Sequence, residues 1–142
     1  MRAMFATFTL THRVEFAETD MAGIVHFSNF FRMMENTEHA LFRSLGHSIH
    51  AAREGETTGW PRVKASCEYL QPLRFEEEVA IRLEVAEVRT RSVRYGFTFS
   101  RVRDGAAVAK GEFTTVCARV REGKLESIPV PDTLRQALLA AS

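Results

Sequence analysis

Two carboxylates stand just before a turn that leads into a predicted helix, and this position suggests acid-base or nucleophilic chemistry. Glu18 and Asp20 are followed by Gly23, and Ser28 or Asn29 can cap the helix that comes next. The first backbone amides of a helix lack intrahelical acceptors and form the positive end of the helix dipole, so they can stabilise an oxyanion. A carboxylate beside such amides is suited to acyl transfer. The simpler alternative is that both acids are ordinary loop residues that compensate the dipole.

Alternating apolar residues predict the strands that must position this loop. Five segments show the period of two that is typical of β-strands, namely residues 8–16, 63–69, 79–85, 93–99 and, less regularly, 107–120. The Asp104-Gly105 pair is typical of a hairpin turn, which favours antiparallel connections.

A helical period interrupts these strands once. Apolar residues recur at helical spacing from Asn29 to Leu45, and Gly46 can end that helix. A short second helix is predicted within residues 131–139, and residues 47–59 are predicted to form the main irregular loop. The order of strand, long helix and four strands predicts an α+β domain with the helix on one face of an antiparallel sheet.

Composition sets limits on the function. The chain has 142 residues and a formal charge of +1, which predicts one domain over residues 1–142 and gives no global field for nucleic acid or an anionic membrane. No apolar run could span a membrane and no signal peptide is recognised, so we expect a soluble, cytoplasmic protein. Cys67 and Cys117 stand alone in strand-like segments, which favours reduced thiols over a disulfide or a zinc site.

The run from Glu18 to Glu35, ETDMAGIVHFSNFFRMME, resembles the signature of the 4-hydroxybenzoyl-CoA thioesterase family. Later segments follow that family in order and spacing, so the resemblance covers nearly the whole chain; they are residues 66–70 with Pro72, Arg89 to Val93, Gly111-Glu112 and Ile128-Pro129. The resemblance implies a hot-dog fold, in which a five-stranded antiparallel sheet wraps around one long helix. It also implies hydrolysis of an acyl-CoA to a free acid and CoA, without a metal or other cofactor.

The resemblance assigns the reaction to the loop described first. Asp20 falls on the catalytic aspartate, which attacks the thioester carbonyl or activates the water that does so. The backbone amide of Phe27 falls on the position that polarises this carbonyl. Gly23 would allow the tight turn, and Glu18 would orient the loop. Glu35 matches an acid in the family's helix, although a solvent-facing helix acid is an equally good interpretation.

A second group of residues is implied for substrate binding. Those that match contacts to the nucleotide and pantetheine of CoA, or that add a cation near them, are Arg62, Val63, Lys64, Arg89, Arg91, Ser92 and Lys124. Each cation alone is equally well an ordinary surface residue. His50 lies near the place where relatives contact an aromatic acyl group. His26 departs by one position from the family's pattern, so it either touches the acyl group or only packs.

Several apolar and acidic residues allow two interpretations. Phe30, Phe31, Met33, Met34 and Trp60 could line an acyl pocket, but such a stripe is more often core.

Glu38 falls within the apolar arc of the helix, between Met34 and Phe42. A buried carboxylate must be paired or have a raised pKa, so Glu38 is a second candidate for a catalytic acid. The alternative is a structural ion pair across a subunit interface.

An exposed edge strand predicts a homodimer, and the resemblance implies a tetramer with active sites between protomers. Two other functions stay open: acyl-thioester hydration or dehydration, for which His26 would be the donor, and non-catalytic acyl-CoA binding. The acyl group, aryl or medium-chain aliphatic, is also open. Motifs of serine hydrolases, NTPases and zinc proteases are absent from the sequence, and nothing completes a metal site around His47 and His50.

Overall fold

The computed structural model describes residues 5–53 and 55–139. Its elements, in chain order, are β1 (Thr7–Arg13), the short 3-10 helix η1 (Phe16–Glu18), α1 (Ser28–Ser44), β2 (Ala51–Arg53), β3 (Glu56–Gly59), β4 (Arg62–Tyr69), β5 (Glu78–Val88), β6 (Ser92–Arg101), β7 (Ala107–Val116), β8 (Ala118–Arg121), β9 (Lys124–Ser127) and α2 (Asp132–Leu139).

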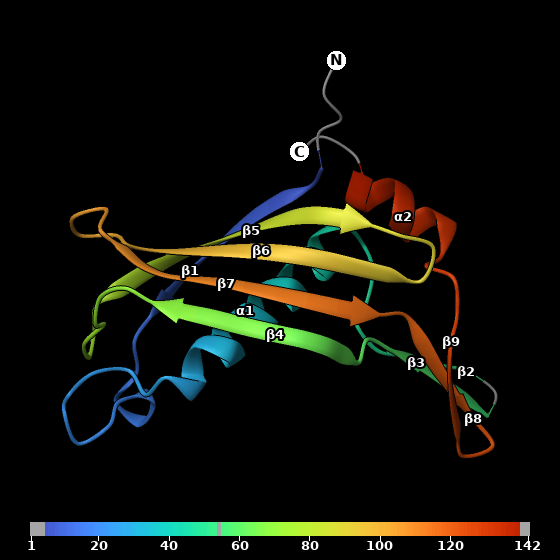
Figure 1. The fold of residues 1–142 in the computed structure, drawn as a ribbon, viewed down its shortest axis with the longest axis horizontal. Coiled ribbons are helices and arrows are strands. Elements are labelled where there is room, and N and C mark those ends of the chain that lie inside the picture. The colour runs from blue at the N-terminus through green and yellow to red at the C-terminus, as the bar shows by residue number, and fades with distance from the viewer. Residues whose placement is uncertain (1–4, 54, 140–142) are drawn as a thin grey trace.

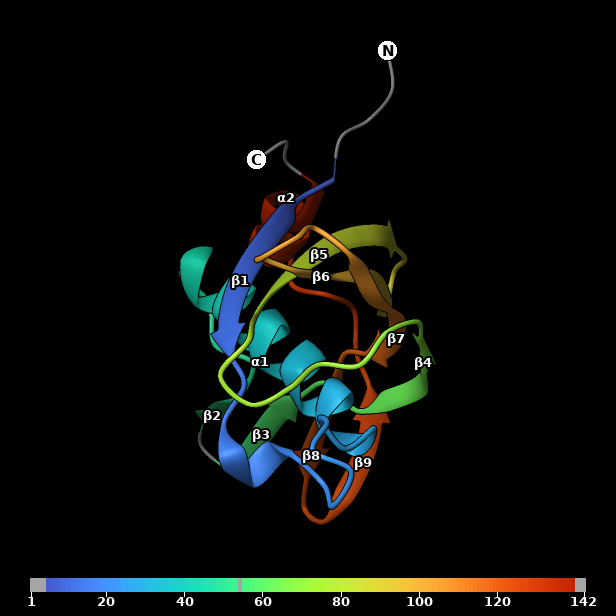
Figure 2. The same ribbon diagram turned by 90° about the vertical axis from the view of Figure 1, so that its left-hand side faces the viewer.

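The main sheet has five strands in the order β1-β5-β6-β7-β4, and all neighbours are antiparallel. Figure 1 shows α1 lying along one face of this sheet, and the turned view in Figure 2 shows the sheet curving around the helix. The predicted α+β class, the long helix and the hot-dog architecture are therefore confirmed. In the described part of the chain, neither helix is long and apolar enough to cross a membrane.

The core lies between the concave face of the sheet and α1. Alternate residues of β5, such as Ile81 and Leu83, are fully buried there, as the period of two predicts. Met34 of α1 lies so close to Gly111 of β7 that an added Cβ atom on the glycine would stand 2.2 Å from the methionine Sδ. Only glycine allows the helix to approach the sheet this closely at that point.

A second, small sheet was not predicted. It has the order β2-β3-β8-β9, so the segment predicted as an irregular loop over residues 47–59 contains two strands. The predicted strand over residues 107–120 is two strands that belong to different sheets and break at Cys117. The segment β3 carries Glu56, Thr57 and Thr58, and a polar strand of four residues shows no apolar alternation for a sequence pattern to detect.

The first strand ends at Arg13 rather than at Phe16 as predicted. The chain turns at Glu15, whose backbone N–H donates to the Glu18 carboxylate at 2.7 Å, and η1 follows. This turn directs the chain away from the sheet and begins the loop that carries Asp20.

Candidate active site

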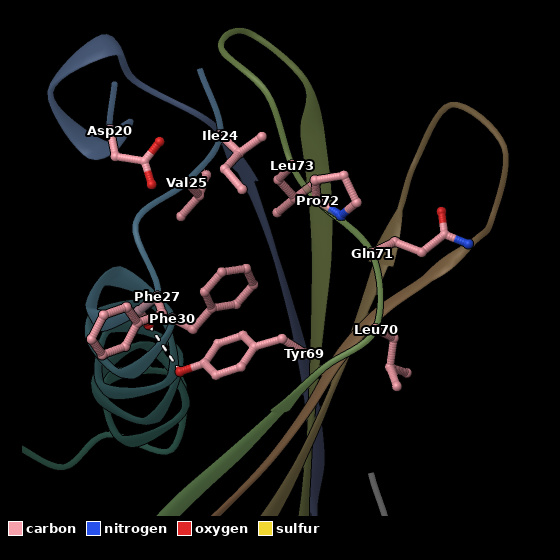
Figure 3. A pocket seen from close by; sticks show the side chains of 10 residues that line it. All are labelled: Asp20, Ile24, Val25, Phe27, Phe30, Tyr69, Leu70, Gln71, Pro72 and Leu73. Atoms are coloured by element: carbon pink, nitrogen blue, oxygen red, sulfur yellow. Dashed lines mark hydrogen bonds between the residues drawn. The ribbon is translucent and has the colours of Figure 1, made fainter. Parts of the chain in front are cut away.

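A cavity of about 480 Å³ opens between the start of α1 and the segment that leaves β4. Figure 3 shows its lining residues, which are Asp20, Ile24, Val25, Phe27, Phe30, Tyr69, Leu70, Gln71, Pro72 and Leu73. The size falls within the range of ordinary small-molecule sites. Of the residues predicted to act in catalysis, Asp20 and Phe27 both line this cavity.

A tight turn holds the Asp20 side chain. Its Oδ1 atom accepts a hydrogen bond from the Ala22 backbone N–H at 2.8 Å, and the Asp20 carbonyl accepts one from the N–H of Gly23 at 2.9 Å. Gly23 has a φ of +80°, a conformation that favours glycine, so this residue type suits the turn. Within residues 5–53 and 55–139, Oδ2 of Asp20 has no hydrogen-bond partner. One carboxylate oxygen is thus fixed while the other is free.

The amide of Phe27 stands at the N-terminus of α1. Its N–H has no hydrogen-bond acceptor among the residues that the structure describes, whereas its carbonyl accepts from Tyr69 Oη at 3.1 Å. Burial raises the pKa of the Tyr69 phenol, with Cys67 as a smaller cause, so the phenol stays protonated and donates. A free amide at a helix N-terminus beside a carboxylate can stabilise negative charge on a bound carbonyl oxygen.

Three aromatic rings form the inner wall. Tyr69 packs edge-to-face on Phe30 with ring centroids 5.1 Å apart, and on Phe27 at 6.4 Å. Sequence reasoning did not single out Tyr69 for the site. The alternation within residues 63–69 identifies it as a strand residue, but only the sheet order shows that the end of β4 meets the start of α1.

Glu18 supports the loop from outside the cavity. Both of its carboxylate oxygens contact His12 Nε2, at 2.8 and 3.0 Å. Its carbonyl accepts from the backbone of His26 at 2.9 Å and from the side-chain amide of Asn29 at 2.8 Å. Glu18 therefore ties β1, the Asp20 loop and the start of α1 together.

His26 is not among the residues that line the cavity, and it packs, which is one of its two predicted roles. Its ring stacks on Phe27 at 4.5 Å, and Nδ1 accepts a weak hydrogen bond from the backbone N–H of Ser28 at 3.3 Å, close to the Ser28 hydroxyl at 2.8 Å. No carboxylate in the described part of the chain contacts this ring. The histidine-acid pair that hydration chemistry would require is therefore not formed within one described chain.

Glu38 is buried in an ion pair within its own chain. Its two oxygens accept from Arg62 Nη2 at 2.6 Å and Nη1 at 3.0 Å, and the guanidinium also lies 4.7 Å from the Phe113 ring centroid. Burial raises the pKa of Glu38 in spite of the opposing effect of Arg62. The predicted pairing across a subunit interface is wrong, and Glu38 does not line the cavity. Glu35 is half exposed, with one oxygen 3.6 Å from Arg62.

The residues predicted to contact CoA lie at the other end of the main sheet. The Asp20 loop extends from the end that Arg13, Tyr69 and Arg101 share, whereas Arg62 belongs to the opposite end. β6 runs ten residues between these ends, which is roughly 30 Å. Figure 1 shows the two ends on opposite sides of the molecule, with the small sheet beyond the second one.

Several predicted binding residues have partners at that second end. Arg91 donates to the Ser127 carbonyl at 2.7 Å, and Arg89 is paired with Glu87. The other members of the group at this end are Val63, Lys64, Ser92, Lys124 and, just before β2, His50. One chain therefore does not bring them to Asp20.

The apolar candidates divide between the cavity and the core. Phe30 lines the cavity, but Met33 and Met34 are buried beneath the sheet, and Phe31 packs against the core. Trp60 contacts Phe42 edge-to-face at 5.6 Å, far along α1 from Phe30. Both cysteines are free thiols, as predicted.

Residues 14–138 match the family model of the thioesterase-like superfamily. The chain belongs to this superfamily. It is 36% identical over 126 residues to the Aquifex aeolicus (strain VF5) protein named "Putative esterase", which covers 86% of this chain and 91% of that one.

Solved structures of known thioesterases share the fold. A 1,4-dihydroxy-2-naphthoyl-CoA thioesterase from Synechocystis superposes with a TM-score of 0.82 at 21% identity and covers 94% of this chain and 96% of its own. A gentisyl-coenzyme A thioesterase has a TM-score of 0.74 at 26% identity, with coverage of 92% and 98%. The predicted resemblance to hot-dog thioesterases is thereby confirmed.

Proposed function

We propose that this protein is an acyl-CoA thioesterase that hydrolyses an aryl- or medium-chain acyl-CoA to the free acid and CoA. The observation that carries this proposal is that one cavity is lined by both Asp20 and Phe27, whose Oδ2 and backbone N–H respectively have no hydrogen-bond partner among the described residues. The superfamily and the thioesterase names of its members support it.

In the proposed reaction the thioester carbonyl lies between these two groups. Its oxygen accepts the Phe27 N–H, and the helix N-terminus stabilises the charge that develops there. Asp20 either takes a proton from an attacking water or attacks the carbonyl itself to form a mixed anhydride that water then hydrolyses. In both routes the C–S bond breaks, the CoA sulfur leaves and is protonated, and the acid is released. No metal or redox cofactor takes part.

The cavity wall favours an aromatic acyl group. Phe27, Phe30 and Tyr69 line the cavity that Asp20 also lines, and Tyr69 packs edge-to-face on the other two rings. Aromatic rings pack well in such arrangements. The naphthoyl and gentisyl groups in the names of two similar structures are aromatic as well. A medium-length aliphatic chain would also satisfy these apolar walls.

The complete site would need a second copy of the chain. β4 is an edge strand whose side chains are exposed on both faces over most of its length. If two copies pair β4 antiparallel about a twofold axis, the start of one strand lies opposite the end of the other. The partner's Lys64 would then approach Tyr69 and supply positive charge for the CoA phosphates. The exposed edge strand β4 is the feature that supports the proposed homodimer, from which a tetramer would be built.

The test is thiol release from a panel of benzoyl-CoA, hydroxybenzoyl-CoA and straight-chain acyl-CoAs. The native protein is compared with Asp20→Asn and with Asp132→Asn, the same change at the start of α2. We expect turnover that falls by about 10²-fold or more in Asp20→Asn and stays unchanged in Asp132→Asn. Acyl-CoA binding without turnover in the native protein would instead indicate a binding module.

A further inference from the structure

Arg101, at the end of β6, is a buried arginine outside the predicted site. Its exposed fraction is 8%, and guanidinium groups are rarely so buried without partners. Nη1 donates to the Asp104 carboxylate at 2.9 Å, and Nη2 donates to the carbonyl of Pro72 at 2.8 Å. Nε lies 3.3 Å from a carboxylate oxygen of Glu77. One guanidinium therefore joins the β6–β7 hairpin to the segment between β4 and β5.

That segment, residues 70–77, is called here the strap, and its first four residues line the cavity. Several hydrogen bonds besides those of Arg101 hold it. At one end the N–H groups of Leu70 and Gln71 donate to the Val108 carbonyl, at 2.8 and 3.1 Å. At the other end the N–H of Glu76 donates to the Val14 carbonyl at 3.0 Å, and the Glu77 carbonyl accepts from the N–H of Val14 at 2.9 Å. The Glu77 carboxylate also closes a turn within the strap by accepting the Arg74 N–H at 2.7 Å. Between them, Arg101 holds the strap at Pro72.

The strap is bonded directly to the loop that carries the carboxylate. The Leu73 carbonyl, next in the chain to the one that Arg101 holds, accepts the N–H of Val25 at 2.8 Å, and Ile24 forms a β-bridge with Arg74. The Ile24 carbonyl accepts the N–H of Asp20 at 2.9 Å. A continuous path of hydrogen bonds and peptide units thus connects Arg101 with Asp20 through the cavity wall.

We propose that Arg101 is a positioning residue that sets where the strap stands relative to Asp20, and thereby which acyl groups fit between them. The proposal rests on the thioesterase function proposed above. Arginine suits this role because its planar fork serves acceptors in different directions at once, whereas the single ammonium of lysine is a point charge. Small displacements of a cavity wall change the fit of a substrate strongly.

The test compares Arg101→Gln and Arg101→Lys with Arg103→Gln. Arg103 contacts the same Glu77 carboxylate, at 3.1 Å, but is exposed and donates to no strap carbonyl. The measured quantity is the ratio of kcat/KM for benzoyl-CoA to that for octanoyl-CoA. A merely structural loss lowers the amount of active enzyme and leaves this ratio unchanged.

We expect Arg101→Gln to change the ratio roughly fivefold or more, and Arg101→Lys to change it less. Arg103→Gln should keep the native ratio. An unchanged ratio in a folded Arg101→Gln variant would overturn the proposal. If Arg101→Gln does not fold, the comparison rests on Arg101→Lys, and a native ratio there would have the same meaning.

Hydrogen exchange separates this proposal from the proposed function. In Arg101→Gln, or in Arg101→Lys if only that variant folds, the Val25 amide should exchange faster than in the native protein and in Arg103→Gln. Amides of β5 should keep the native rate. If no acyl-CoA is turned over, the thioesterase proposal fails while the exchange data still test whether Arg101 holds the loop. If the Val25 amide of the Arg101 variant exchanges at the native rate, the positioning role is wrong even when the enzyme is active.

Discussion

Arg62, at the start of β4, donates hydrogen bonds from both of its terminal nitrogens to the carboxylate of Glu38, in the middle of α1. This ion pair joins the edge of the sheet to the central helix. The carboxylate is fully buried, and the guanidinium is mostly covered. A buried pair of this kind costs desolvation energy that its own attraction only offsets when both partners are present.

Removing one partner should therefore destabilise the protein much more than replacing both partners with apolar residues. We expect Glu38→Ala to lower the free energy of unfolding by about 3 to 5 kcal/mol, because it leaves the Arg62 charge without its partner. The double variant Glu38→Leu with Arg62→Met should recover most of this loss. Urea denaturation measures the free energy of unfolding of both variants. The control is Arg82→Ala, which breaks the exposed pair with Glu84 and should cost less than about 1 kcal/mol. Equal losses in the single and double variants would contradict this account.

Removal of a polar group at Tyr95 should not destabilise the protein, in contrast to the loss of Glu38. Its hydroxyl is buried and has no hydrogen-bond partner among the residues that the structure describes, so Tyr95→Phe removes an unsatisfied group. We expect the free energy of unfolding to stay level or to rise by about 1 kcal/mol. A clear loss of stability would show that the hydroxyl has a partner after all.

The same residue predicts a pH effect. Burial raises the pKa of Tyr95 well above its usual value near 10, so above that pH the unfolded chain releases a proton that the folded protein keeps. Stability should fall as the pH rises through this range, and Tyr95→Phe should reduce the fall. Thermal unfolding at a series of alkaline pH values measures this loss of stability. If the unfolding temperature falls equally with pH in the native protein and in Tyr95→Phe, the prediction is wrong.

Gly111 should not accept a side chain. A Cβ atom there would stand 2.2 Å from Met34 Sδ, so Gly111→Ala should lower the free energy of unfolding by about 1 to 3 kcal/mol. Gly96 of β6 has open space at the corresponding position, which makes Gly96→Ala the matched control. Calorimetry should also show partial rescue of Gly111→Ala by Met34→Ala. Without rescue, the clash with Met34 would not be the cause.

Tyr69 offers a test of the aromatic wall. Tyr69→Phe keeps the ring but loses the hydrogen bond to the Phe27 carbonyl, and we expect kcat/KM to fall only a few-fold, about 1 kcal/mol. Tyr69→Ala should also raise KM more for benzoyl-CoA than for octanoyl-CoA. Steady-state kinetics with both substrates decides this, and equal effects on the two would argue against an aryl-binding wall.

Sequence patterns predicted the parts of this fold that repeat over many residues. The elements β5, β6 and α1 have ten or more residues, so the alternation over residues 79–85 and 93–99 and the helical period each predicted their element to within a few positions. The strands β2, β3 and β9 have three or four residues and few apolar side chains, so no period could identify them.

The site followed from the sequence in part. Asp20, Gly23 and Phe27 are neighbours in the chain, so a motif could place them together. Tyr69 reaches the site through the order of strands in the sheet, and Arg101 reaches it through its contacts with the strap, among them the Pro72 carbonyl. Backbone acceptors leave no trace in side-chain patterns, which is why the position of Arg101 had to come from the structure.

The two ends of the main sheet carry two separate groups of candidate functional residues. Residues 16–30 surround the carboxylate at one end, while the cations of residues 62–64 and 89–92 lie at the other, roughly 30 Å away. For the proposed thioesterase, this separation means that residues 62–64 and 89–92 could change the preferred carrier of the acyl group without any change in the residues around Asp20.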